Sequence, residues 1–153
     1  MNVSDPEIRP AVESDLPALA SLMVELGYPI SLAEMRARFD AVTTSPNDEI
    51  LVAEVEGKVV ALIGLRVMLS LHRVARVGEY SALVVSAPYR RRGIGQALVA
   101  QAEQWLLAKG VTSLRVASNN RRQEEAHRFY AALGYEATHT LFRKELTALS
   151  SDE

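Results

Sequence analysis

The stretch that decides the fold is Leu83-Val84-Val85-Ser86-Ala87-Pro88-Tyr89-Arg90-Arg91-Arg92-Gly93-Ile94-Gly95-Gln96-Ala97-Leu98. It has the pattern of an apolar strand, a basic loop and the start of a long helix. A helix N-terminus offers unpaired backbone N–H groups and the positive end of the helix dipole. Glycines let that backbone approach a phosphate, and flanking arginines add charge-assisted hydrogen bonds. The stretch therefore predicts a diphosphate site over residues 90–95. The alternative is a solvated basic turn whose glycines cap a helix.

Two common phosphate-binding loops do not fit this stretch. A P-loop ends in Lys-Ser or Lys-Thr, and that ending is absent. A Rossmann fingerprint needs a third glycine, but Gly93 and Gly95 are followed by the bulky Leu98. A Rossmann loop also belongs to the first βα unit of a parallel sheet, whereas apparent hairpins precede this loop.

Hydrophobic periodicity predicts the other elements of the chain. We expect strands over residues 7–11, 50–55, 58–65, 77–85, 113–117 and 135–146, and helices over 15–26, 31–42, 93–109 and 124–133. Asp15 stands at the expected cap of the first helix, Ser31 and Glu34 match a capping box, and Glu56-Gly57 is a tight hairpin turn. The order β-α-α-β-β-β-α-β-α-β predicts a mixed α/β (α+β) fold in one domain over 1–153, with a frayed tail from about residue 147.

Composition limits the class of protein. The chain has 153 residues, a net charge of −2 and no cysteine. The absence of cysteine excludes disulfides, zinc–cysteine sites and a thiol nucleophile, and we expect no metal. The net charge and few aromatic residues argue against a nucleic-acid partner. The first ten residues do not resemble a signal peptide, and no apolar run approaches the roughly 20 residues that span a bilayer. We therefore expect a cytoplasmic protein without a membrane partner.

The opening stretch resembles the acetyl-CoA-binding motif of the GNAT family of N-acetyltransferases, Arg/Gln-x-x-Gly-x-Gly/Ala after an apolar strand. Arg90, Gly93 and Gly95 fill its defined positions. A second match downstream, Ala126-His127-Arg128-Phe129-Tyr130-Ala131-Ala132-Leu133-Gly134-Tyr135-Glu136, looks like the later motif of that family. The resemblance implies a GNAT fold with a central, mostly antiparallel mixed sheet flanked by helices. It also implies an acetyl-CoA-dependent N-acetyltransferase acting on a primary amine, which we expect to be on a small molecule.

The resemblance also implies roles for individual residues. Tyr130 would be the general acid for the CoA thiolate, with a core aromatic as the alternative. Asn119, just after a strand, would contact CoA or be only a turn residue. The remaining cofactor-binding residues would be Leu83, Val84 and Val85, through their backbone, and Arg90, Arg91, Arg92, Gly93, Ile94, Gly95 and Gln96 in the loop.

Glu79 is the predicted general base, because family members often place a carboxylate on this strand. Strand alternation puts Glu79, Ser81 and Leu83 on one face, and Tyr80 and Ala82 on the other. The alternative is an exposed strand charge that pairs with Arg76.

Other functions remain open at this point. The chain could be a non-catalytic acyl-CoA sensor or could acetylate a protein or peptide. The identity of the amine is not readable from the sequence, and a homodimer is only a family expectation.

Overall fold

The computed structural model describes residues 5–117 and 123–147. The chain divides into two compact units, residues 1–116 and 117–153. The first unit contains β1 (Glu7–Pro10), η1 (Glu13–Asp15), α1 (Leu16–Leu26), α2 (Leu32–Thr43), β2 (Asp48–Val55), β3 (Lys58–Met68), β4 (Arg76–Val85), η2 (Ala87–Tyr89), α3 (Ile94–Ala108) and β5 (Val111–Val116). The second unit contains α4 (Gln123–Ala132). The prediction of one domain over 1–153 stays a prediction.

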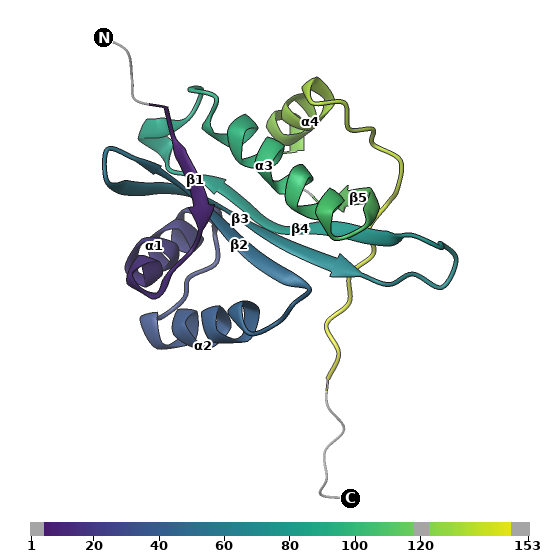
Figure 1. Cartoon of the computed structure of the whole chain (residues 1–153), viewed down its shortest axis with the longest axis horizontal. Coiled ribbons are helices and arrows are strands. Elements are labelled where there is room, and N and C mark those ends of the chain that lie inside the picture. The colour runs from purple at the N-terminus through teal and green to yellow at the C-terminus, as the bar shows by residue number, and fades with distance from the viewer. Residues whose placement is uncertain (1–4, 118–122, 148–153) are drawn as a thin grey trace, which may run out of the picture. The chain divides into compact units, whose positions relative to one another are not determined.

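The strands of the first unit form one sheet in the order β1-β2-β3-β4-β5. The first three pairs are antiparallel, and β4 and β5 are parallel. Helices α1 and α2 lie on one face of this sheet and α3 on the other (Figure 1). The predicted mixed α/β fold with a mostly antiparallel sheet is therefore confirmed.

Strand β3 is central and is covered on both faces. Residues 60–65 are all buried, and such a continuous apolar run is what a strand covered on both faces requires. The core toward α1 and α2 contains Leu16, Leu19, Leu22, Met35, Phe39, Ile50, Val52, Leu62 and Val84. The buried side chains of α3 are Ile94, Leu98, Val99, Ala102 and Leu106.

Strand β4 carries a β-bulge at Ser81. In the antiparallel ladder with β3, Gly64 lies opposite Ala82 and the next residue, Leu65, lies opposite Tyr80. Ser81 therefore has no residue opposite it. A bulge of this kind bends the strand and redirects the side chains that follow it.

The bulge reverses the predicted alternation along β4. Residues opposite each other in an antiparallel pair share a face of the sheet. By register with β3, Tyr80 and Ala82 point to opposite faces, and Glu79 shares a face with Ala82 rather than with Leu83. The alternation predicted from the sequence is wrong because the extra residue, Ser81, shifts the period of two by one position.

Several local predictions are confirmed. Gly27 ends α1 with φ 104°. At the start of α2, Ser31 Oγ accepts a hydrogen bond from Glu34 N at 3.1 Å and donates to Glu34 Oε1 at 3.0 Å. Glu56 and Gly57 both have positive φ, 51° and 80°, as a two-residue type I′ hairpin turn requires.

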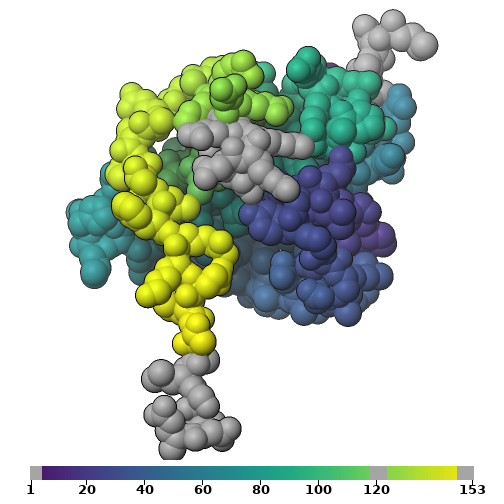
Figure 2. All heavy atoms as spheres, turned by 180° about the vertical axis from the view of Figure 1, so that it is seen from behind, coloured from purple at the N-terminus to yellow at the C-terminus, as the bar shows by residue number. Residues whose placement is uncertain are grey.

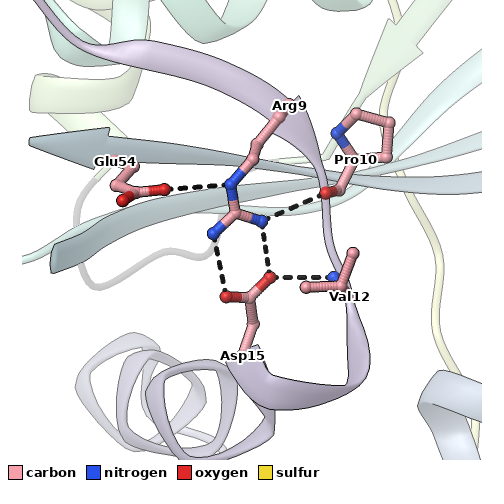
Figure 3. Close-up of polar contacts among 5 residues, drawn as sticks. All are labelled: Arg9, Pro10, Val12, Asp15 and Glu54. Carbon is pink, nitrogen blue, oxygen red and sulfur yellow. Dashed lines mark hydrogen bonds and ion pairs between the residues drawn. The ribbon is translucent and has the colours of Figure 1, made fainter. Parts of the chain in front are cut away.

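An ion-pair cluster around Arg9 joins β1, β2 and the start of α1 (Figure 3). Arg9 donates to both carboxylate oxygens of Asp15, at 2.7 and 3.0 Å, and to Glu54 Oε2 at 3.0 Å. Asp15 also accepts from Val12 N at 2.8 Å. Asp15 is at the N-cap position of α1 as predicted, but its side chain makes no cap hydrogen bond to that helix, because Arg9 and Val12 occupy it.

In the second unit, α4 confirms the predicted helix over 124–133, and Gly134 follows it with φ 89°. The predicted strand over 135–146 is wrong, because residues 135–147 have no regular secondary structure. A strand needs a neighbour for its N–H and C=O groups, and no described strand pairs with this segment. Leu141 and Phe142 are adjacent, so no single sheet face could bury both, and they are 74% and 91% exposed.

Candidate active site

The predicted diphosphate loop lies between η2 and α3. Arg90 Nε donates to Val85 O at 2.9 Å, so this arginine ties the loop to the end of β4. The Arg92 guanidinium lies over the Tyr89 ring, 5.4 Å from its centroid. Arg91 and Arg92 are exposed, so both side chains are accessible to an anion.

The start of α3 carries a row of backbone N–H groups without acceptors. The first amide of the helix to find a carbonyl is Ala97 N, which donates to Gly93 O at 3.0 Å. In the part of the chain that the structure describes, the amides of residues 91–96 donate to no acceptor. A Cβ built on Gly93 would meet nothing within 4 Å. Free amides at the start of a 15-residue helix, beside open space at Gly93, suit a diphosphate.

The backbone of this loop is partly strained. Arg91 has φ 63°, which is uncommon for a residue with a side chain. Gly93 has φ 78°, where glycine avoids the clash of a Cβ. Strained residues of this kind persist where the surrounding structure holds them, and they concentrate at functional sites.

The second half of β4 has strand neighbours on one side only. The ladder between β4 and β5 ends at Tyr80 opposite Val116. Leu83, Val84 and Val85 remain paired with β3 on the other side. Among the described residues, no strand pairs with the β5 side of this segment. Val85 O accepts from Arg90 Nε, and the other backbone groups on that side are available to an extended ligand.

Glu79 lies on β4 two residues before the bulge. Its Oε2 accepts a hydrogen bond from Arg115 Nε of β5 at 3.1 Å. The side chain of Glu79 is 28% exposed and that of Arg115 is 67% exposed. The partner predicted for a purely structural Glu79 was Arg76, but the observed partner is Arg115. No sequence pattern indicates Arg115, because the parallel register of β4 and β5 places it there.

Tyr130 lies on α4, in the second unit, half-buried against Phe129 and Tyr135. Its ring centroid is 5.1 Å from that of Phe129 and 5.3 Å from that of Tyr135. Burial raises the pKa of Tyr130 to about 12, so its phenol keeps its proton at neutral pH. Asn119 lies outside the described residues.

The first unit thus brings together the loop residues 90–96, the free side of β4 and Glu79. Tyr130 belongs to the second unit, and its surroundings are described within that unit alone. The described residues contain no group of three or more His, Asp or Glu side chains that could hold a metal. None of the helices described is both long enough and apolar enough to cross a membrane.

Comparison with known proteins agrees with this geometry. The profile of the Acetyltransferase (GNAT) family matches residues 16–135. An aminoalkylphosphonate N-acetyltransferase of Salmonella typhimurium is 33% identical over 141 residues, which cover 92% of this chain and 91% of the relative.

Solved structures show the same fold. A GNAT family acetyltransferase of Staphylococcus aureus superposes with a TM-score of 0.79 at 23% identity, covering 94% of this chain and all of that one. An aminoglycoside N-acetyltransferase in complex with CoA superposes with a TM-score of 0.84 at 16% identity, covering 96% of this chain and 98% of that one.

The chain belongs to the GNAT family of acetyltransferases. The predicted class of enzyme, an acetyl-CoA-dependent N-acetyltransferase, is confirmed.

Proposed function

We propose that this enzyme acetylates a short primary amine that carries an acid group, of the aminoalkylphosphonate type, and that its CoA diphosphate binds at residues 90–96. The substrate type rests on the relative that is 33% identical over nearly the whole chain. The cofactor site rests on one observation in this structure, the free amides of residues 91–96 beside exposed arginines.

The residues of the chain fit the CoA group. The start of α3 and Arg92 would hold the diphosphate, and the free side of β4 from Leu83 to Val85 would pair with the pantetheine amides. Bound acetyl-CoA supplies the thioester that is cleaved. Asn119 stays a predicted further contact.

The proposed chemistry needs the amine to lose two protons and the thiolate to gain one. Glu79 takes the first proton from the ammonium group of the substrate, directly or through a water. The amine nitrogen then bonds to the acetyl carbon while the carbon–sulfur bond breaks, and Tyr130 gives its proton to the departing thiolate. The second proton that the nitrogen loses passes through water and restores the Tyr130 phenol. No bond to the enzyme is formed, so the absence of cysteine is no obstacle.

The cofactor site is tested by calorimetric titration with acetyl-CoA. Gly95→Trp should abolish binding by filling the loop, and Arg92→Ala should weaken it by about tenfold, as expected for loss of a charge-assisted contact. Arg38→Ala, an exposed arginine on α2, is the matched control and should bind as the wild type does. Unchanged affinity in Gly95→Trp would refute the site.

Acetyl transfer is tested by following free thiol release with a panel of amines. Release with 2-aminoethylphosphonate supports the proposed substrate type. Tight acetyl-CoA binding with no release for any amine would refute it and favour the sensor alternative.

A further inference from the structure

Four charged side chains form one row across the sheet. Asp48 of β2 lies opposite Arg66 of β3, Arg66 lies opposite Glu79 of β4, and Glu79 lies opposite Arg115 of β5. We call this set the charge row. Because opposite residues share a face, all four lie on the face to which Ala82 also belongs, the face that packs against α1 and α2.

The signs alternate along the charge row, and the outer pairs are formed. Arg66 Nε lies 3.6 Å from Asp48 Oδ1, and Arg115 Nε lies 3.1 Å from Glu79 Oε2. The arginine side chains are 53% and 67% exposed. Exposed pairs of this kind contribute little to folding stability, about 0–1 kcal/mol each, so stability alone does not explain four aligned charges.

Arg115 retains donors for a further acceptor. A guanidinium carries five N–H donors. Here Nε donates to Glu79, and Nη2 makes a weak 3.8 Å contact with Met68 Sδ. The planar fork of an arginine matches the oxygens of a phosphonate, a phosphate or a carboxylate.

We propose that Arg115 determines substrate specificity by binding the acid group of the acceptor while Glu79 binds its amine. This inference rests on the proposed function above. Glu79 and Arg115 lie opposite each other on neighbouring strands. The backbones of such strands are about 4.8 Å apart. Two carbon atoms between an amine and an acid group span a similar distance. A short zwitterion can thus replace the Glu79–Arg115 pair by two ion pairs of its own.

The same geometry favours Arg115 over Arg66 as the residue that binds the acid group. Arg66 lies on the other side of Glu79 and is paired with Asp48, so its charge is already compensated within the sheet. Arg115 has Glu79 as its only carboxylate partner among the described residues. When the substrate ammonium group pairs with the Glu79 carboxylate, the Arg115 guanidinium can pair with the acid group of the substrate.

The test compares amines of equal length with and without an acid group. For the wild type, kcat/KM should be at least about tenfold higher for 2-aminoethylphosphonate than for propylamine. Arg115→Gln should lower kcat/KM for 2-aminoethylphosphonate by about 10- to 100-fold, mainly through KM, the range expected for loss of a charged hydrogen bond. The value for propylamine should be unchanged or higher. Arg115→Lys should recover part of the loss.

Arg66→Gln is the matched control, with an arginine removed from the same row, and should stay within about twofold of the wild type. Equal losses in Arg66→Gln and Arg115→Gln, or an equal loss for propylamine, would overturn the inference. Two further amines, O-phosphoethanolamine and 3-aminopropanoate, show which acid groups Arg115 binds. If the rates with both also depend on Arg115, then Arg115 binds any short acid. If only the rate with 2-aminoethylphosphonate depends on Arg115, then Arg115 binds the phosphonate specifically.

Calorimetric binding of 2-aminoethylphosphonate separates this inference from the proposed function. Binding that is lost in Arg115→Gln supports the role of Arg115 even if no acetyl transfer occurs. Binding that is equal in wild type and Arg115→Gln overturns it. Absence of transfer to every amine refutes the proposed function itself.

Discussion

Replacing Asp15 should destabilise the fold far more than replacing the exposed carboxylate of Glu13 nearby. The Asp15 side chain is only 6% exposed, and it accepts two hydrogen bonds from Arg9 and one from Val12 N. Asp15→Ala removes all three and leaves a partly buried guanidinium edge and a partly buried backbone N–H without their acceptor. Charged hydrogen bonds contribute about 1.5–3 kcal/mol each when buried, and an orphaned donor costs about 1–3 kcal/mol.

These contributions are reduced in this cluster because the Arg9 side chain is 26% exposed and keeps Glu54 as a partner. We therefore expect Asp15→Ala to lower the free energy of unfolding by about 3 kcal/mol. For a chain of this length, such a loss lowers Tm by roughly 6–12 °C.

The assay is urea denaturation followed by circular dichroism, with the slope m unchanged from the wild type. Glu13→Gln is the matched control. It removes a carboxylate two residues away whose ion pair with Arg36 is exposed, at 71% and 51%, so the loss should be under about 0.5 kcal/mol. Similar losses in the two variants would refute the argument from burial.

The same carboxylate gives a pH signature. Hydrogen bonding from Arg9 holds the pKa of Asp15 below its usual range. The stabilisation is therefore present above the unfolded pKa of about 3.9 and is lost as pH falls through the lower folded pKa. The difference between wild type and Asp15→Asn should shrink below about pH 4. A difference that stays constant down to about pH 2 would contradict the shifted pKa.

Two further perturbations test the core and α4. Leu98→Ala, at a fully buried position of α3, should lower the free energy of unfolding by about 2–5 kcal/mol in urea denaturation. A loss under about 1 kcal/mol would contradict its burial. Because the pKa of Tyr130 is raised to about 12, the folded chain holds a proton that the unfolded chain releases near pH 10. Stability present below about pH 10 should fall as pH rises toward about 12. Tyr130→Phe should abolish this component, whereas a phenolate signal from Tyr130 appearing at about pH 10 in ultraviolet titration would refute it.

Features that depend on a few neighbouring residues were predictable from the sequence. The Ser31–Glu34 capping box and the Glu56-Gly57 turn formed as predicted because both need only side chains or φ values within four residues. The loop over residues 90–95 was predictable for the same reason, since glycines and a helix start are local features. The strand-loop-helix order is also the context in which the family motif is recognisable from the sequence.

Features that depend on another part of the chain were not predictable. The bulge at Ser81 follows from how β4 pairs with β3, and it overturned the predicted faces of Tyr80 and Ala82. The side chain of Asp15 suits a helix cap by its type, but Arg9 competes for it from a neighbouring strand. Arg115 has no motif of its own, and only the parallel register with β4 places it opposite Glu79.

The bulge also explains how one strand can take part in both halves of the proposed reaction. Before Ser81, β4 is paired on both sides and presents Glu79 within the charge row. After Ser81, its β5 side has no strand partner among the described residues, and the strand leads through Val85 to the loop at residue 90. The proposed acceptor site and cofactor site are therefore consecutive along β4. Because Arg115 is exposed and its ion pair contributes little to stability, substitutions at Arg115 can alter the accepted amine while the cofactor half and the fold remain intact.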